Sequence, residues 1–114
     1  LPVDPKLGRM LLAGNDLGAL RELLIITSGL SVQDPRERPL DAQQAADEAH
    51  RKLADERSDF LSYVKLWDYV ETARANKESN RKFDQEMKRR FLSPRRLREW
   101  REVEHQLERG ASHF

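Results

Sequence analysis

The spacing of apolar residues is the feature that most constrains the fold of this sequence. Apolar side chains recur at three- and four-residue intervals along nearly the whole chain. This period matches the α-helix, in which positions i, i+3, i+4 and i+7 share one face. The one β-like stretch, 25–32, is also compatible with a helix. We therefore predict an all-α domain, a compact antiparallel bundle of five or six helices joined by short loops.

Helix-starting and helix-ending residues divide the chain. Residues with N-cap propensity precede the apolar runs at Asp4, Asn15 or Asp16, Asp41, Ser58, Ser79 or Asn80, and Ser93. Pro5 and Pro94 then occupy first helical positions, where proline is favoured. Gly29 and Gly110 are expected to end the second and the last helix. We expect residues 5–109 to form the bundle and residues 110–114 to form a flexible tail.

Each predicted helix carries a candidate core face. The helix containing 17–26 is apolar nearly all round, so we expect it in the middle of the bundle. The other faces are Leu7, Met10 and Leu11; Ala42, Ala45, Ala46, Ala49 and Leu53; Phe60, Val64 and Trp67, with Tyr63 and Val70 beside them; Phe83, Met87 and Phe91; and Leu97, Trp100, Val103 and Leu107. The tryptophans and Phe91 are therefore expected in the core rather than as platforms for stacked bases.

Several classes of function are excluded by what the chain lacks. It has no cysteine, and its three histidines are scattered at positions 50, 105 and 113, so no metal site is expected. No lysine follows a glycine, which excludes a phosphate-binding loop, and we expect no catalytic residue in this chain. The longest aliphatic run, 23–26, is too short to span a membrane, which fits a cytoplasmic domain. The start at Leu1, without methionine, indicates a fragment.

The tetrapeptide Asp47-Glu48-Ala49-His50 has the letters that name the DEAH-box ATPases. In such a motor the motif follows a hydrophobic strand, so that its carboxylates face magnesium and phosphate. Here it follows a helix-forming stretch without β-branched residues, 42–46. We expect these four residues to form a solvated helix face, without catalytic or metal-binding function.

Positive charge is concentrated in one segment. The chain as a whole has a net charge of +1, but residues 81–102 contain nine basic and four acidic residues, a local net charge of +5. A possible basic surface consists of Lys88, Arg89, Arg90, Arg95 and Arg96. Such a cluster can bind phosphates, but a solvated surface or a docking face for other domains is the favoured explanation.

The order of several motifs resembles a known family. They are 1–11, 24–32 with Ser31-Val32, Arg38-Pro39, 46–50, 58–67, Phe91-Leu92 and Leu97-Arg98-Glu99-Trp100. Together they resemble the helical, ratchet-like helicase-associated domain of DEAH-box ATP-dependent RNA helicases. The segments 31–40 and 43–48 are similar to the bacterial HrpA branch. The resemblance covers nearly all of 1–108, with 1–4 as the remnant of a connection from a winged-helix domain.

The resemblance implies a role without catalysis. The domain would help to form a channel for single-stranded RNA over two RecA-like motor domains, which bind ATP and magnesium and move the strand 3′ to 5′. Its other partners would be the winged-helix and OB-fold domains of the same chain. The family's RNA-lining positions correspond to Ser31 and Arg38, and Arg36 and Gln33 are further candidates on the same loop.

Simpler roles remain open for these residues. The hydroxyl of Ser31 can satisfy a helix carbonyl, and Arg38 can be solvated or paired with Asp34 or Asp41. The alternative function is a helical protein-interaction or scaffold domain without RNA contact. That alternative is favoured if the loop 31–40 points away from the basic segment or is buried. If the domain lines an RNA channel, we expect Ser31 and Arg38 to share one exposed surface at the mouth of a groove.

Overall fold

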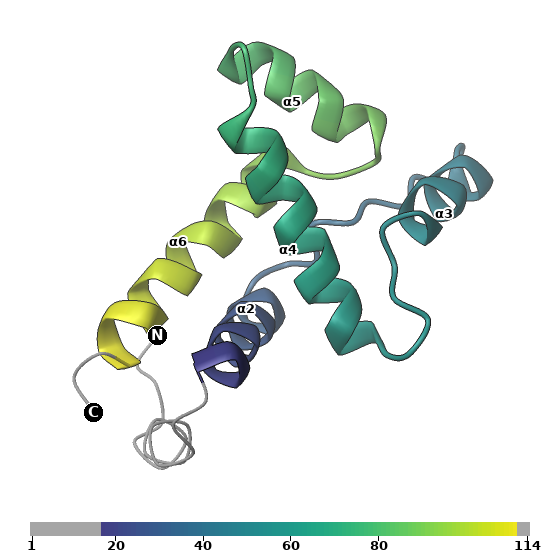
Figure 1. Ribbon diagram of the computed structural model, residues 1–114. Helices are drawn as coiled ribbons and strands as arrows, with labels where there is room; N and C mark the ends of the chain where they lie inside the picture. The colour runs from purple at the N-terminus through teal and green to yellow at the C-terminus, as the bar shows by residue number, and fades with distance from the viewer. Residues whose placement is uncertain (1–16, 112–114) are drawn as a thin grey trace.

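Five helices make up the part of the chain that the computed structural model describes, residues 17–111. They are α2 (Leu17–Ser31), α3 (Gln43–Arg51), α4 (Asp59–Ala75), α5 (Asn80–Arg89) and α6 (Pro94–Ala111) (Figure 1). The prediction of an all-α bundle is confirmed. The expected first helix with Asp4 and Pro5, the caps at Asn15 or Asp16, and residues 112–114 lie outside the described residues.

The second predicted helix, α2, is not enclosed by the bundle as expected: four of its 15 residues, Leu24, Ile25, Ser28 and Gly29, are buried, whereas Leu17 and Leu30 are 75% and 57% exposed. It makes its most extensive contacts with α6 and then with α4, while α5 packs against α6. The main core contains Ile25, Tyr63, Leu66, Val70, Phe83, Met87, Leu92, Leu97 and Trp100. Trp100 is 1% exposed, and its indole N–H donates to the carbonyl of Ile25 at 3.0 Å and to the hydroxyl of Ser28 at 3.0 Å. These bonds join α6 to α2.

Gly29 does not end α2, which continues to Ser31. Instead, Gly29 is buried where α2 meets two aromatic rings. A Cβ atom at this position would lie 2.8 Å from Cδ1 of Tyr63 and 3.2 Å from Cε2 of Trp100. The glycine is therefore explained by close helix packing, which its sequence position alone did not reveal.

Three of the predicted caps are confirmed by hydrogen bonds. The hydroxyls of Ser58, Ser79 and Ser93 accept from the backbone N–H groups three residues later, at 3.0, 3.1 and 3.3 Å. The cap predicted at Asp41 is wrong, because the residue before α3 is Ala42 and no side chain caps that helix. The expected end at Gly110 is also wrong, since α6 continues to Ala111.

The buried face of α4 differs from the predicted one. Ser62, Tyr63, Leu66 and Val70 are buried, whereas Phe60 is 56% exposed. Val64 and Trp67 are only partly buried, although both pack against the core. The buried face of α4 therefore includes Tyr63, Leu66 and Val70. It is shifted by about one residue from the predicted face, which begins at Phe60.

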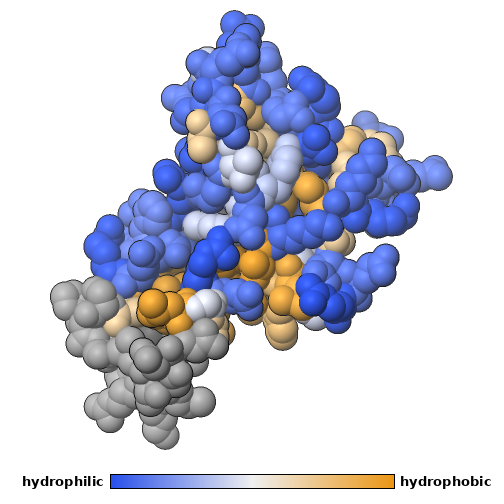
Figure 2. Space-filling model, viewed as in Figure 1, coloured by the Kyte–Doolittle hydropathy of each residue, from blue (hydrophilic) through white to orange (hydrophobic). Residues whose placement is uncertain are grey.

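A second apolar cluster lies where α2 begins and α6 ends. It contains the buried Leu24, Leu107 and Ala111, with the partly buried Leu20 and Val103 against them. Figure 2 shows hydrophobic residues gathered at this end, in contrast to the hydrophilic surface of α5. None of the helices within residues 17–111 is long and apolar enough to cross a membrane.

The turn between α5 and α6 has a specific backbone geometry. Phe91 has a positive φ of 57°, which is rare for a residue with a side chain. The N–H of Phe91 donates to the carbonyl of Lys88 at 3.0 Å, and that of Leu92 donates to the carbonyl of Met87 at 2.9 Å. This is the Schellman arrangement, in which a left-handed residue satisfies the last helix carbonyls. Phe91 is thus partly buried at a turn, rather than fully in the core as expected.

Candidate nucleic-acid interface

The loop 32–42, between α2 and α3, is fixed against the turn that follows α5. Backbone N–H of Glu37 donates to the carbonyl of Phe91 at 2.8 Å, and that of Ser93 donates to the carbonyl of Pro35 at 2.8 Å. Arg36 and Leu92 form an isolated antiparallel bridge between these two bonds. The loop therefore has a defined conformation, and it contacts residues 91–93, in the middle of the basic segment 81–102.

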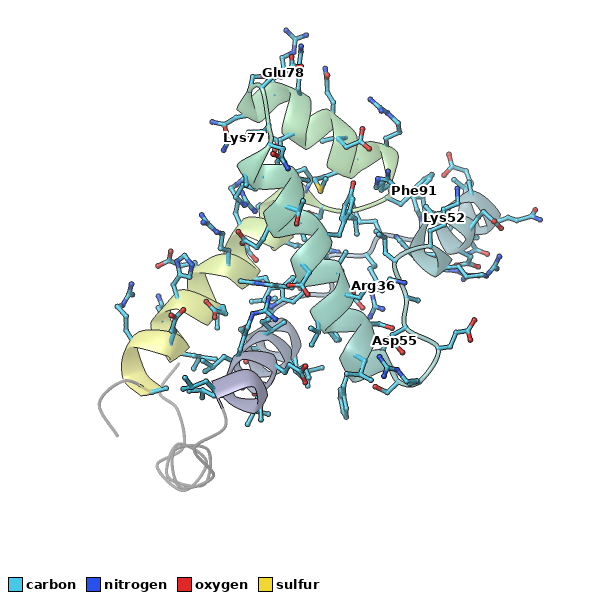
Figure 3. The ribbon with its side chains drawn as sticks, in the orientation of Figure 1. Arg36, Lys52, Asp55, Lys77, Glu78 and Phe91 are labelled. Carbon is cyan, nitrogen blue, oxygen red and sulfur yellow. The ribbon has the colours of Figure 1, made fainter. Side chains whose placement is uncertain are left out.

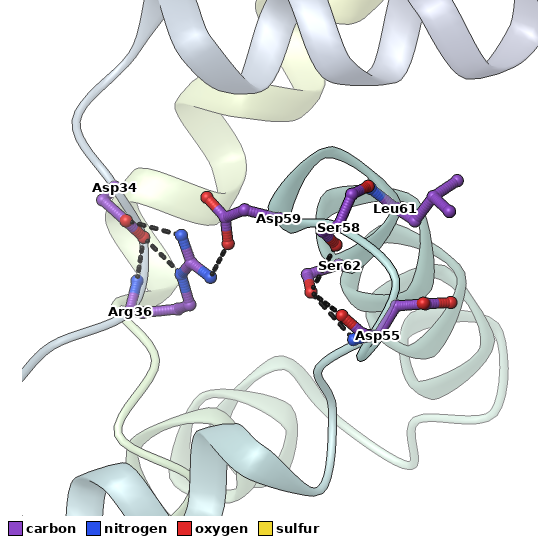
Figure 4. A network of polar contacts seen from close by, with 7 residues as sticks. All are labelled: Asp34, Arg36, Asp55, Ser58, Asp59, Leu61 and Ser62. Carbon is purple, nitrogen blue, oxygen red and sulfur yellow. Dashed lines mark hydrogen bonds and ion pairs between the residues drawn. The ribbon is translucent and has the colours of Figure 1, made fainter.

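Arg36 connects this loop to α4 (Figures 3 and 4). Its guanidinium donates to both carboxylate oxygens of Asp34, at 2.9 and 2.8 Å, and to Asp59 at 3.1 Å. It also lies over the ring of Tyr63, 5.1 Å from the centroid. The hydrogen bonds that Arg36 donates to Asp34 and Asp59 raise its pKa above the ordinary value, against the effect of partial burial. The guanidinium of Arg36 is therefore held by contacts within the domain.

The start of α4 is held by a second part of the same polar network (Figure 4). The hydroxyl of Ser62 accepts from the backbone N–H of Asp55 at 2.8 Å, and the hydroxyl of Ser58 accepts from the N–H of Leu61 at 3.0 Å. These bonds fix the first turn of the helix that presents Asp59 to Arg36.

Arg38 is exposed and pairs with Asp47 on α3. Its Nε donates to Oδ1 at 2.8 Å and its Nη2 donates to Oδ2 at 3.0 Å. The side chain of Arg38 is 55% exposed and that of Asp47 is 43% exposed. The hydrogen bonds between them raise the pKa of Arg38 and lower that of Asp47. The partner is neither of the acids considered from the sequence, Asp34 and Asp41.

Ser31 and Gln33, the other candidates near this loop, are also exposed. The hydroxyl of Ser31 donates to the carbonyl of Thr27 at 2.8 Å, which is the helix-terminal role considered from the sequence. The same oxygen keeps its acceptor capacity. Both side chains lie at the end of α2 where the loop begins.

The five residues of the predicted basic surface have different environments. Arg89 and Arg90 both pair with Glu86, and Arg90 also lies over the ring of Tyr69 at 5.0 Å. Arg95 pairs with Glu99 at 3.4 Å. Arg96 is partly buried and donates to the carbonyl of Asp34 at 3.1 Å. Lys88 is exposed and has no ion-pair partner within residues 17–111.

Part of the basic surface forms a groove beside the loop. The groove is lined by Lys88, Arg95, Arg96 and Arg98, with Glu37, Asp84, Ser93 and Pro94. Arg89 and Arg90 are not among its lining residues. Arg98 belongs to the basic cluster found in the sequence, whereas Glu37 was not predicted to lie beside it. Glu37 joins the groove to the loop, but Arg38 and Ser31 are not among its lining residues, so the expected placement of these two side chains at a groove is not confirmed.

The tetrapeptide 47–50 lies on α3, as expected. Its side chains form structural contacts: Asp47 pairs with Arg38, Glu48 pairs with Arg51 at 2.9 Å, and Nε2 of His50 bonds to the carbonyl of Phe91 at 2.9 Å. Within the described residues, no group of three or more histidine or acidic side chains is arranged to hold a metal ion.

Comparison with known proteins gives the family. The model of the ratchet-like helicase-associated domain (HA2) matches residues 4–105. The chain is 49% identical over 107 residues to the ATP-dependent RNA helicase HrpA of Escherichia coli, covering 94% of this chain. It is 45% identical over 107 residues to the HrpA homolog of Haemophilus influenzae, again covering 94% of the chain. A third relative, the human ATP-dependent DNA/RNA helicase DHX36, is 40% identical over 75 residues, covering 65% of this chain and 7% of that protein.

The chain spans 8% of the length of each of the two HrpA relatives. It therefore corresponds to one domain of these helicases and contains a small part of their length. With the match to the family model over most of its residues, the chain belongs to the ratchet-like helicase-associated domain family of DEAH/DExH-box RNA helicases.

Proposed function

We propose that this chain is a non-catalytic domain of a cytoplasmic ATP-dependent 3′–5′ RNA helicase and lines the path of single-stranded RNA over the RecA-like motor domains. ATP and magnesium bind to the motors, and the winged-helix and OB-fold domains of the same chain are its other neighbours. The observation that carries the proposal is Arg38, an exposed guanidinium on a loop with a fixed backbone.

The placement of the loop supports an RNA contact over a purely structural role. A loop that pointed away from the basic segment, or that was buried, would have favoured a scaffold domain without RNA contact. The loop instead bonds to Phe91 and Ser93, inside that segment, and Arg38 is more than half exposed. Arginine at such a position suits a phosphate, because its planar fork forms two charge-assisted hydrogen bonds at once.

The neighbouring residues fit a strand that continues past Arg38. Lys88 and Arg95 on the groove are exposed cations at which a phosphate can release counterions. Ser31 and Gln33 present exposed polar side chains at the end of α2, where the loop of Arg38 begins. Arg36 contributes by holding the loop rather than by direct contact, because three of its five N–H donors bind Asp34 and Asp59 and its side chain is only 24% exposed.

The test is the variant Arg38→Ala in the full-length helicase that carries this domain. Affinity for a labelled single-stranded RNA, measured by fluorescence anisotropy, should fall roughly tenfold, as expected for one charge-assisted contact. RNA-stimulated ATP hydrolysis should fall with it. Basal ATP hydrolysis should stay unchanged, because this domain has no phosphate-binding loop and Arg38 is proposed to act on RNA alone.

Arg57→Ala is a matched control. Arg57 pairs with Asp55 in the same geometry, with Nε to Oδ1 at 3.1 Å and Nη2 to Oδ2 at 2.9 Å, but on the loop between α3 and α4. The control variant should bind RNA like the wild type. Equal RNA affinity for the wild type and Arg38→Ala would refute the RNA-lining role and favour a scaffold function.

A further inference from the structure

Asp47 occupies only one edge of the Arg38 guanidinium. The carboxylate binds Nε and Nη2, and these two hydrogen bonds use two of the five N–H donors of an arginine. The other edge, formed by Nη1 and the second hydrogen of Nη2, has no hydrogen-bond partner within residues 17–111. An oxygen pair of a phosphodiester can bind this open edge while Asp47 stays in place.

The loop of Arg38 and the helix of Asp47 are also joined through a shared hydrogen-bond acceptor. The carbonyl oxygen of Phe91 accepts from the N–H of Glu37, which precedes Arg38, and from Nε2 of His50, which lies one helical turn after Asp47. Since a carbonyl can only accept, Nε2 of His50 carries the proton. On the same helix, Ala46, next to Asp47, is fully buried. One acceptor atom thus connects the loop of Arg38 to the helix of Asp47.

We propose that Asp47 is a positioning residue that fixes the guanidinium of Arg38 for contact with an RNA phosphate. An exposed arginine otherwise loses much side-chain freedom when it binds, and that loss weakens the contact. A carboxylate on an anchored helix removes the freedom before RNA arrives. Exposed ion pairs of this kind contribute little to fold stability, so the pair is better explained by orientation of Arg38. This inference rests on the proposed RNA-lining role.

The sign of the effect distinguishes this proposal from simple electrostatics. Removal of an exposed acid near a polyanion site raises RNA affinity, by less than about twofold at physiological salt. Removal of a positioning residue lowers it. Asp47→Asn should therefore reduce RNA affinity roughly two- to tenfold, which is the factor expected from ordering one long side chain.

The experiment compares RNA affinity of four variants of the full-length helicase: Asp47→Asn, Glu48→Gln, Arg38→Ala and the double variant Arg38→Ala/Asp47→Asn. Glu48→Gln removes the same charge from the next position of α3, where the partner is Arg51. It should leave affinity unchanged or slightly raised. In the Arg38→Ala background, Asp47→Asn should have no further weakening effect, because its action passes through Arg38.

The outcomes separate this inference from the proposed function. If Arg38→Ala weakens RNA binding but Asp47→Asn does not, Asp47 has no positioning role and the RNA contact stands. If Asp47→Asn strengthens binding more than Glu48→Gln does, Asp47 competes with RNA for Arg38, which overturns the proposal. If Asp47→Asn weakens binding equally with and without Arg38, its effect is a general structural one. If Arg38→Ala has no effect, the proposed function itself fails.

Discussion

The guanidinium of Arg36 lies over the ring of Tyr63, with 5.1 Å between Cζ and the ring centroid. Through this contact and the pair with Asp59, a side chain of the loop 32–42 is attached to two successive turns of α4. The same loop is bonded by its backbone to the turn after α5. Arg36 thus helps to set the position from which Arg38 is presented.

Arg36→Ala should lower the free energy of unfolding by about 1–2 kcal/mol, through loss of the cation–π contact and the bonds to two carboxylates. Chemical denaturation measures this change. Arg36→Lys should recover only part of it, because an ammonium group cannot form the two parallel bonds to Asp34. Arg51→Ala, which removes an exposed pair with Glu48, is the control and should change stability little. Equal effects at the two positions would contradict the role of Arg36.

Gly29→Ala should destabilise the fold by about 1–3 kcal/mol, the usual cost of overpacking a well-filled core. The added methyl group meets the Tyr63 ring at 2.8 Å, and the ring is held against Trp100 in an edge contact with 5.6 Å between centroids. Gly18→Ala is the matched control. Gly18 is exposed near the start of the same helix, so alanine there should stabilise the helix by roughly 0.5–1 kcal/mol. Thermal denaturation of both variants distinguishes packing from helix propensity.

Stability should fall as the pH rises from about 4.5 to about 7, because of Glu104. Burial of this side chain, which is 9% exposed, with nearby Glu108 and Glu71, raises its pKa from 4.5 to about 7, against the effect of Arg21. His105 lies 3.9 Å from the same carboxylate. Because the pKa of Glu104 is higher in the folded protein, its carboxylate binds a proton more tightly there than in the unfolded chain. The stabilisation is complete below pH 4.5 and is lost by about pH 7, at about 1.4 kcal/mol per unit of pKa difference.

The variant Glu104→Gln checks this pH dependence. It should be more stable than the wild type at pH 8, and its unfolding free energy should vary little between pH 4.5 and 7. Glu108→Gln should give an intermediate profile, because it removes one of the carboxylates that raise the pKa of Glu104. An unchanged pH profile in Glu104→Gln would show that another group is responsible.

Lys88→Ala should weaken RNA binding by the full-length helicase and reduce the slope of log affinity against log salt by roughly 0.7–1, the value for one phosphate contact. Anisotropy titrations at several salt concentrations measure the slope. Lys77→Ala is the charge-matched control, because Lys77 lies at the opposite end of α5 from Phe91 (Figure 3). Equal slopes in the two variants would place the groove outside the RNA path.

Local signals in the sequence were enough for much of the fold. Ser58, Ser79 and Ser93 act as caps because a hydroxyl satisfies a backbone N–H only three residues away. The three- and four-residue spacing of apolar residues likewise identified buried side chains, namely Phe83, Met87, Leu97, Trp100 and Leu107. The predictions for Gly29 and Phe60 were wrong because their outcomes depend on helices far along the chain. At Asp41 the reason is local, since the turn from Pro39 to Ala42 makes Ala42 the residue before α3.

The candidate site was predictable only in outline. Its four candidates, Ser31 at the end of α2 and Gln33, Arg36 and Arg38 on the loop, were singled out from the sequence, and their contact with RNA stays a prediction. Nothing local indicated that Arg36 would turn toward Asp59 and Tyr63 while Arg38 stays exposed, since both are arginines in a charged loop. The partner of Arg38 was also unforeseen, because Asp47 becomes its neighbour through the path of the loop and the placement of α3.

The sequence by itself determined the all-α class, the helix starts at three serines and, through its motifs, the family. The class and the helix starts follow from the spacing of apolar residues and from capping, which act over a few positions of the chain. The family follows from the order of residues within and between the motifs. Only the tertiary structure decided which arginine is held inside and which is presented to solvent. Arg36 is held by Asp59 and Tyr63 of α4, whereas Arg38 meets the exposed Asp47 of α3. These neighbours meet because the chain folds back on itself, as in the hydrogen bonds from Glu37 and His50 to the carbonyl of Phe91, which join segments more than 40 residues apart.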